Sequence, residues 1–247
     1  MGSLNAIEVD DVSKGFVLRR GRSLKELAAL AVKGHQLTDQ FQALDGVSLT
    51  VEQGQTVALL GLNGSGKSTL LKLISGVMRP DSGSVRVRGR IAGLIEVGAG
   101  LHPDLTGREN VFLNGAILGM SEAQIRREFD AIVDFSGVEQ FLDTEVKFYS
   151  SGMFLRLAFA VAVHTEPDVF LVDEILAVGD EPFQAKCLAR IQQLSEEGRT
   201  LVVVSHDLDL VEKVCDRGVV LESGHLVIDG PVRKAVSRLR TGRPAAS

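Results

Sequence analysis

A glycine-rich segment that ends in lysine and serine is the part of this sequence best suited to chemistry. Residues 61–68 read Gly-Leu-Asn-Gly-Ser-Gly-Lys-Ser, a GxxxxGKS phosphate-binding loop. An apolar run, 56–60, precedes it, and a helix-forming run, 67–74, follows it, which favours a strand–loop–helix unit over a chance glycine-rich turn. The glycines let backbone N–H groups surround an anion, and the helix start adds partial positive charge. We therefore expect Lys67 to reach the β and γ phosphates of a nucleotide and Ser68 to coordinate Mg²⁺.

Two acidic residues at the end of another apolar run are suited to metal binding and to water activation. The run 169–172 leads into Asp173 and Glu174. Asp173 is expected to help hold Mg²⁺, directly or through water, and Glu174 to act as general base on a hydrolytic water. Without the phosphate loop, a solvated acidic strand end would be the better interpretation. His206 follows a third apolar run, 201–204, and is a candidate sensor of the γ phosphate.

The composition is that of an ordinary globular protein. Hydrophobic residues make up 45% of the 247 residues and charged residues 24%. No apolar run approaches the roughly 18 residues that a membrane span needs, and the first ten residues do not form a signal peptide. These features predict a cytosolic chain. Cys187 and Cys215 lack metal-ligand spacing and are expected to be buried thiols.

Apolar runs and helical segments alternate along the chain. These are the strands and helices that must position the phosphate loop, the acidic pair and His206. The expected strands are 7–9, 47–51, 57–60, 85–87, 91–97, 169–172, 201–204, 219–221 and 226–228, the last two as a hairpin, and helical periodicity dominates 107–163. Doubly buried strands joined by helices indicate a parallel α/β core, which binds ligands at the carboxyl ends of its strands. The phosphate loop, Asp173 and His206 each follow such an end, so we expect them to converge.

The segment from Tyr149 to Met153, which reads Tyr-Ser-Ser-Gly-Met, distinguishes among classes of phosphate-loop protein. Together with Arg156 and a helical run after it, the segment resembles the signature of the ATP-binding cassette (ABC) family, Leu-Ser-Gly-Gly-Gln followed by an arginine. The order of loop, signature, acidic strand and histidine matches that family over nearly the whole chain. The resemblance implies one nucleotide-binding domain over 1–247. Its α/β P-loop ATPase core would carry an antiparallel β part and a helical subdomain at about 105–165.

The resemblance also assigns roles residue by residue. Phe16 would stack on adenine, Asp180 falls at the D-loop, and Glu96 falls at the Q-loop, where glutamine is usual and where a carboxylate would bind Mg²⁺ more strongly. The contacts to ATP in the loop would be Gly61, Asn63, Gly64, Ser65, Gly66, Lys67, Ser68 and Thr69. A second copy would present its Ser150, Ser151, Gly152 and Met153 to that ATP. Catalysis would rest on Glu174, His206 and Lys67, and Mg²⁺ on Ser68, Asp173 and Glu96.

Departures from the usual motifs indicate a branch of the family. The signature variant, Glu96 and the segment 173–180 resemble the ATPase subunits of bacterial polysaccharide exporters for O-antigen, teichoic acid, capsule or cell-wall galactan. This implies a homodimer at the cytoplasmic face of the cell membrane, bound to a separate pair of permease subunits that handle a lipid-linked polysaccharide. An ABC exporter of drugs or lipids is the alternative. A soluble ABC protein of DNA repair or translation is less favoured, because those fuse two cassettes or insert a long coiled coil, and we expect no nucleic-acid partner.

An insertion at 17–40 separates the first two expected strands by more residues than a hairpin needs. It carries five basic side chains (Arg19, Arg20, Arg22, Lys25 and Lys33) against Glu26 and Asp39, and its apolar residues Leu24, Leu27, Ala28 and Ala31 share one helical face. A solvated loop and a segment that contacts lipid head groups or the permease both remain open. A second basic segment, 231–240, is expected to be a helix.

Overall fold

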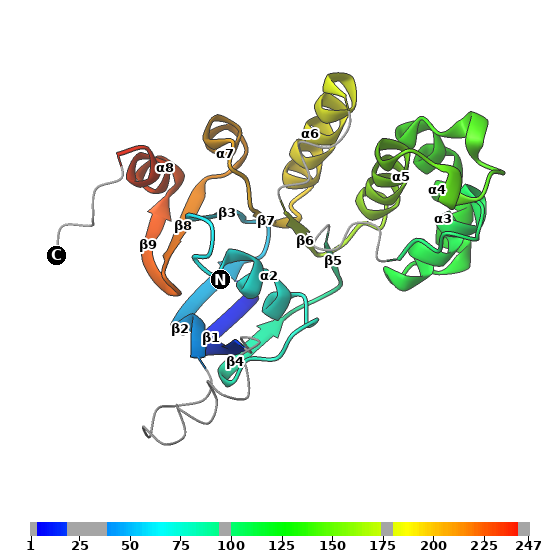
Figure 1. Ribbon diagram of the computed structural model, residues 1–247. Helices are drawn as coiled ribbons and strands as arrows, with labels where there is room; N and C mark the ends of the chain where they lie inside the picture. Colours follow the sequence, from blue (N-terminus) through cyan, green and yellow to red (C-terminus); the bar gives the residue numbers. More distant parts are fainter. Residues whose placement is uncertain (1–3, 19–38, 94–99, 174–179, 242–247) are drawn as a thin grey trace, which may run out of the picture.

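The computed structural model describes residues 4–18, 39–93, 100–173 and 180–241 (Figure 1). Its strands are β1 (Asn5–Leu18), β2 (Asp39–Glu52), β3 (Thr56–Leu60), β4 (Ser82–Val87), β5 (Ile91–Gly93), β6 (Val169–Val172), β7 (Thr200–Val203), β8 (Arg217–Glu222) and β9 (His225–Pro231). Its helices are α2 (Lys67–Ile74), α3 (Gly107–Ile117), α4 (Glu122–Ser136), α5 (Ser151–Val163), α6 (Glu181–Glu196), α7 (Leu208–Val214) and α8 (Val232–Thr241), with 3₁₀ turns η1 (Glu139–Phe141) and η2 (Val146–Phe148).

The larger sheet has six strands in the order β5-β6-β7-β3-β8-β9. The first five are parallel, and β9 returns antiparallel to β8 as the expected hairpin. Strands β3, β6 and β7 are buried at every residue, which explains their continuous apolar runs. The mixed α/β class predicted from the sequence is thereby confirmed.

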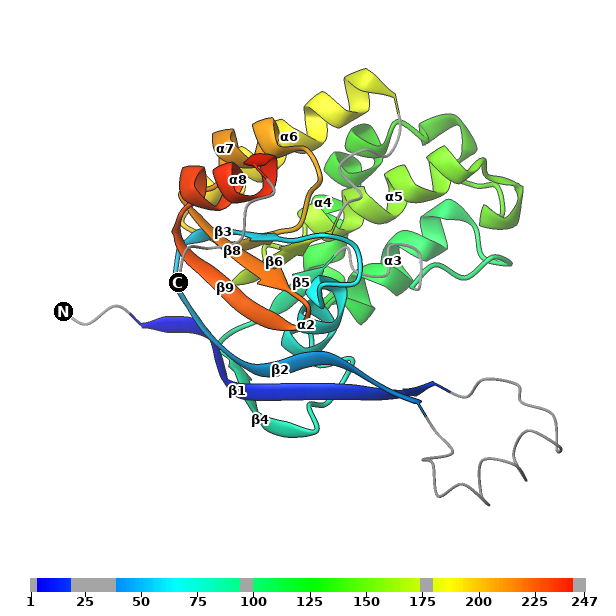
Figure 2. The ribbon, with the colours of Figure 1, turned by 60° about the vertical axis from the view of Figure 1, so that its left-hand side comes forward.

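Each face of this sheet packs into its own hydrophobic core. Ala58 and Leu60 of β3 point into a core shared with α6, α7 and α8, whereas Val57 and Leu59 point into a core shared with α2 and the smaller sheet. Alternate residues of a strand face opposite sides, so one five-residue strand supports both cores. Figures 1 and 2 show the three helices on one side of the sheet and α2 with β1, β2 and β4 on the other.

The smaller sheet is antiparallel, in the order β2-β1-β4. Its two long strands extend well beyond the expected runs 7–9 and 47–51, and pairing continues through Val17 opposite Gln40. The insertion expected at 17–40 therefore begins and ends inside paired strands, and residues 19–38 lie outside the described part. The expected run 91–97 is a strand only over β5, because residues 94–99 also lie outside it.

Helices α3, α4 and α5 form a helical subdomain beside the β5–β6 edge of the sheet (Figure 1). Thr106 and Ser121 begin α3 and α4 with complete capping boxes, and Gly137 ends α4 in the left-handed conformation. Helix α5 packs on both sides, because Phe159 joins the core over the sheet while Leu157 joins the core of the subdomain. The helical segment expected at 107–163 is confirmed, as three helices and two short turns.

The C-terminal basic segment forms α8, as expected, and packs on β8. Arg238 of this helix donates two hydrogen bonds to the Glu222 carboxylate of β8, at 2.9 and 2.7 Å. Within the described ranges, every helix is too short or too polar to cross a bilayer.

Candidate nucleotide-binding site

The phosphate loop connects the buried strand β3 to the start of α2. Gly61 and Gly66 both have positive φ, 147° and 107°, and both are tightly enclosed. A Cβ added at Gly61 would lie 2.3 Å from the Leu221 carbonyl oxygen, and one at Gly66 would lie 2.5 Å from the Ala43 carbonyl oxygen. Only glycine meets both demands, so the loop is held against β8 and β2.

The first turn of α2 faces the loop with no side-chain cap at Gly66. The first N–H groups of a helix have no partner inside the helix, so an external anion can accept from them. Lys67 begins this helix and is 8% exposed, and its ammonium donates to the carbonyl oxygens of Gly61 at 2.8 Å and Leu62 at 3.1 Å. The positive charge is therefore held inside the curve of the loop.

The environment of the Ser65 side chain indicates whether the loop suits a phosphate ligand. Its backbone N–H closes the turn to the Leu62 carbonyl at 3.1 Å, and its side chain is 4% exposed. In the part of the chain that the structure describes, its hydroxyl is one of the few buried polar atoms without a hydrogen-bond partner. An unsatisfied hydroxyl and a buried ammonium in the same loop fit a ligand that brings several acceptor oxygens.

A cavity of about 320 Å³ opens on this loop. Its lining residues are Phe41, Ala43, Asn63, Gly64, Gly66, Lys67, Ser68 and Thr69. Six of these were predicted from the sequence as ATP contacts. Phe41 was not, and the signal that could have found it is an isolated aromatic residue in the polar stretch 39–42. Phe16, predicted to stack on adenine, is not among the lining residues and instead pairs across the strands with Phe41.

The sheet order brings the predicted catalytic elements to one edge. Strand β7 lies between β3 and β6, all three are parallel, and the Val204 N–H donates to the Val172 carbonyl at 2.7 Å just beyond the paired strands. Asp173 follows β6 and is partly buried, while His206 follows β7 and is exposed. They therefore lie at the same edge as the phosphate loop. Glu174 and Glu96 are outside the described residues, so their roles stay predictions.

The signature residues lie at the start of α5, away from the phosphate-loop cavity. Ser150 is the N-cap, and its hydroxyl accepts from the Met153 N–H at 3.2 Å. Ser151 is exposed and begins the helix, with Gly152 next. Tyr149 points back into the subdomain, where its hydroxyl donates to the Phe141 carbonyl at 2.8 Å and burial raises its pKa. None of the signature residues lines the cavity of its own chain.

Asp180 connects the signature helix to α6. It is the N-cap of α6, accepting from the Phe183 N–H at 3.3 Å, and it accepts from Arg156 of α5 at 2.5 Å. The Arg156 guanidinium also lies 5.1 Å from the Phe183 ring centroid. The residue predicted at the D-loop is therefore tied directly to the helix that carries the signature.

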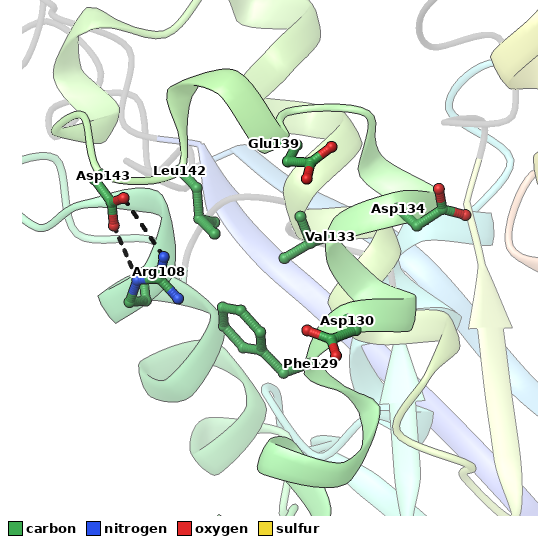
Figure 3. Close-up of a pocket in the computed structure, with 8 residues that line it drawn as sticks. All are labelled: Arg108, Phe129, Asp130, Val133, Asp134, Glu139, Leu142 and Asp143. Carbon is green, nitrogen blue, oxygen red and sulfur yellow. Dashed lines mark hydrogen bonds and ion pairs between the residues drawn. The ribbon is translucent and has the colours of Figure 1, made fainter.

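A second cavity, of about 390 Å³, lies within the helical subdomain (Figure 3). Arg108 is paired there with Asp143 at 2.9 Å and lies 5.3 Å from the Phe129 ring centroid, and this pairing lowers the pKa of Asp143. The remaining charged side chains of the lining are carboxylates: Asp130, Asp134 and Glu139. Such a wall repels phosphate, so this cavity is no candidate for the nucleotide.

Comparison with known proteins identifies the family. A family model described as ABC transporter matches residues 44–177, which span the phosphate loop, the signature and Asp173. The chain belongs to the ABC transporter family. A solved ATP-binding subunit of an ABC transporter has the same fold, with a TM-score of 0.76 and 26% identity, covering 98% of this chain and 95% of that one. The ABC-type ATPase fold and the coupling of ATP hydrolysis to transport follow from this membership.

Curated relatives narrow the branch of the ABC family. ABC transporter protein AbcA of Aeromonas salmonicida is 50% identical over 93% of this chain and 74% of its own length. O-antigen export system ATP-binding protein RfbB of Klebsiella pneumoniae is 41% identical, and the match covers 89% of this chain and 91% of the length of RfbB. Teichoic acids export ATP-binding protein TagH of Lactiplantibacillus plantarum is 40% identical over 95%, but the match spans only 64% of that protein.

Proposed function

We propose that this chain is the ATP-hydrolysing subunit of an ABC exporter that moves a lipid-linked cell-surface polysaccharide across the cytoplasmic membrane. The observation that carries the proposal is the match to relatives named for O-antigen export and for teichoic acid export along about nine-tenths of the chain. The two cargoes differ, so the class of exported polymer is better supported than any one member of it. An ABC exporter of drugs or lipids is the alternative.

The described residues supply the phosphate-binding half of the reaction. Lys67 and the first turn of α2 hold the phosphates, and the buried Ser65 hydroxyl adds a further donor. Ser68 and Asp173 would hold Mg²⁺, with Glu96 as a third candidate, and the bound ion neutralises charge on the phosphate oxygens. Glu174 would take the proton of the attacking water, and His206 would contact the γ phosphate.

A second copy of this chain would complete the site. Ser150 and Ser151 are exposed at the N-terminus of α5, where helix N–H groups favour an anion. They do not line the cavity of their own chain. In the proposed dimer, each copy presents residues 150–153 to the ATP of the other. ATP then biases the association of the two copies, and a pair of membrane permease subunits positions them at the cytoplasmic face.

The dimer is tested with Glu174→Gln and Lys67→Ala. Replacing the carboxylate by an amide removes the proton acceptor but keeps the shape, so Glu174→Gln should abolish turnover and accumulate an ATP-bound dimer in size-exclusion chromatography. Lys67→Ala should lose nucleotide affinity and remain monomeric with ATP. The runs include the purified permease in detergent as a second condition, because in the proposal the membrane subunits hold the two copies together. A Glu174→Gln variant that stays monomeric in both conditions contradicts the proposal.

The identity of the exported cargo is tested in cells from which the gene for this chain has been deleted. Loss of the chain should leave the surface polymer inside the cytoplasmic membrane, and wild type, but not Lys67→Ala at equal expression, should restore export. Normal surface polymer in the deleted strain, together with lost resistance to a drug, would favour the alternative exporter.

The basic insertion at 17–40 is proposed to face the membrane or the permease. Replacing Arg19, Arg20, Arg22 and Lys25 by serine should spare ATP binding and reduce export. Full export by that variant at normal expression would favour the other interpretation, in which the segment is a solvated loop.

A further inference from the structure

A third cavity, of about 220 Å³, lies at the edge of the larger sheet opposite the phosphate loop. It is lined by Asp168, which precedes β6, and by Thr200, which begins β7, whereas the phosphate loop follows the far end of β3. Because β3, β6 and β7 are parallel, the two sites lie at opposite ends of the same strands. The volume is below the roughly 300–1,000 Å³ of sites for drug-sized ligands, so the cavity suits a small ion with water.

Arg199 brings to this cavity a positive charge with unused hydrogen-bonding capacity. Its Nε atom is buried and has no hydrogen-bond partner among the residues that the structure describes. Its Nη1 atom lies 3.9 Å from an oxygen of the Asp168 carboxylate, which is longer than a hydrogen bond. A buried N–H of a charged group without an acceptor costs free energy, so an acceptor oxygen placed in the cavity would stabilise the folded chain.

Two further donors of the lining come from different parts of the fold. Thr200 is buried, and its hydroxyl accepts from the Gly54 N–H at 3.1 Å, which leaves the hydroxyl hydrogen for a ligand. Arg88 follows β4 of the smaller sheet, is exposed and lines the cavity. A guanidinium presents several N–H groups in a planar fork that matches the oxygens of phosphate. Donors from both sheets therefore meet at one small cavity.

The two carboxylates of the lining are already engaged by other groups of the chain. The Glu197 carboxylate pairs with Arg190 at 3.5 Å, and the Asp168 carboxylate accepts from the Arg90 N–H at 2.7 Å. Together with Arg190, the two arginines of the lining outnumber these two carboxylates. The excess positive charge favours an anion over a cation in the cavity.

We propose that this cavity binds a small inorganic oxyanion of the phosphate type between Arg199, Thr200 and Arg88. The oxyanion supplies the acceptor that the buried Arg199 Nε–H lacks, and its other oxygens accept from the Thr200 hydroxyl and the Arg88 guanidinium. It thereby connects the end of β4 to the start of β7 and stabilises the contact between the two sheets. The site does not use the phosphate loop, so it is independent of the proposed function.

Binding of inorganic phosphate is measured in the Lys67→Ala chain, because the phosphate loop of the wild type is itself expected to bind phosphate. Equilibrium dialysis with radiolabelled phosphate should show saturable one-to-one binding. A site with a Kd of about 1 mM raises Tm by about 3–6 °C in roughly 10 mM phosphate at constant ionic strength, for a chain of this length. Adding Arg199→Gln should weaken phosphate about 10- to 150-fold, the range for losing a hydrogen bond from a charged group, and remove the rise in Tm.

Arg88→Gln and Arg86→Gln form a matched pair in the same Lys67→Ala background. Both arginines are exposed, but Arg86 pairs with Glu8 at 3.0 Å and does not line the cavity. Arg88→Gln should weaken phosphate about 2- to 5-fold, because an exposed ion pair contributes little, and Arg86→Gln should leave its affinity unchanged. Since Arg88 is exposed, its variant tests the site even where Arg199→Gln fails to fold.

Two results would overturn the oxyanion site. One is the absence of saturable phosphate binding in Lys67→Ala that circular dichroism shows to be folded. The other is an equal gain in Tm from phosphate in Lys67→Ala alone and in its combinations with Arg88→Gln and Arg199→Gln. Phosphate stabilises folded proteins in general by exclusion from their surface, and a gain that is the same in every variant would be that general effect.

Discussion

Two glycines of the phosphate loop should respond very differently to the same substitution. Gly64 and Gly66 both have positive φ, 79° and 107°, so an alanine at either position strains the backbone. Their surroundings differ. A Cβ at Gly64 would meet nothing within 4 Å, whereas one at Gly66 would lie 2.5 Å from the Ala43 carbonyl oxygen and 2.7 Å from a methyl carbon of Leu44.

The sizes of the two effects follow from these distances. Alanine with positive φ costs about 1–2 kcal/mol of folding free energy, which is the whole expected loss for Gly64→Ala. At Gly66 the nearest atom is a backbone oxygen of a buried strand and cannot rotate away, so overpacking adds about 1–3 kcal/mol. A chain of this length loses roughly 2–4 °C of Tm per kcal/mol. We expect a drop of about 2–8 °C for Gly64→Ala and of about 4–20 °C for Gly66→Ala, and a larger drop for Gly66→Ala when the two are measured together.

The assay is thermal unfolding by circular dichroism, with ATP affinity measured on the same samples at low temperature. Gly76→Ala is the matched control, because Gly76 has φ 77° and nothing within 4 Å of its added Cβ, but it follows α2 outside the cavity. It should match Gly64→Ala in Tm and leave ATP affinity unchanged, whereas Gly64→Ala should weaken ATP because its methyl group projects beside the cavity. Equal Tm losses for Gly64→Ala and Gly66→Ala would refute the packing argument.

Three further outcomes follow from other contacts. In a double-mutant cycle, Arg156→Ala and Asp180→Ala should show a coupling of about 0.2–1 kcal/mol, because the pair is partly exposed, and strictly additive losses would contradict the link between α5 and α6. Burial holds the pKa of His164 below its ordinary 6.5, so folding stability should fall as the pH drops below about 6.5, with a smaller fall in His164→Gln, measured as Tm against pH. Burial raises the pKa of Cys187 and Cys215 to about 12, so a thiol reagent at about pH 8 should label them only after unfolding, and fast labelling of the folded chain would contradict their placement.

The central strands could be predicted from the sequence almost to the residue. β3 and β6 are buried on both faces, so every residue except Thr56 is apolar and each run ends where its strand ends. The start of α2 was equally clear, because Gly66 ends the loop and Lys67 begins the helix. In such segments burial and local conformation impose the same boundaries.

The long hairpin was underestimated because its outer half has no such pattern. Between Val9 and Gly15 the β1–β2 register shifts three times, and Asp11 has positive φ, so apolar residues do not alternate there. Periodicity finds a strand only where one face is continuously buried. The paired residues near Phe41 are instead held by backbone hydrogen bonds to a partner strand more than twenty residues away in sequence.

The two halves of the nucleotide cavity differ in the same way. The phosphate side is built from nine consecutive residues, 61–69, whose types and spacing predict a phosphate-binding loop. The structure places this loop between a strand and a helix start, and six of its residues line the cavity. The opposite wall depends on which strand of the smaller sheet lies against Gly66. Phe16 and Phe41 are cross-strand partners on one face; the resemblance indicated only Phe16, whereas Phe41 is the one that lines the cavity. The Ala43 carbonyl lies close to Gly66, which brings β2 to the loop and places Phe41 in the cavity wall. A contact between a glycine and a distant backbone carbonyl leaves no pattern in side-chain types, and for that reason the sequence indicates most of residues 61–69 as lining of this cavity but does not indicate Phe41.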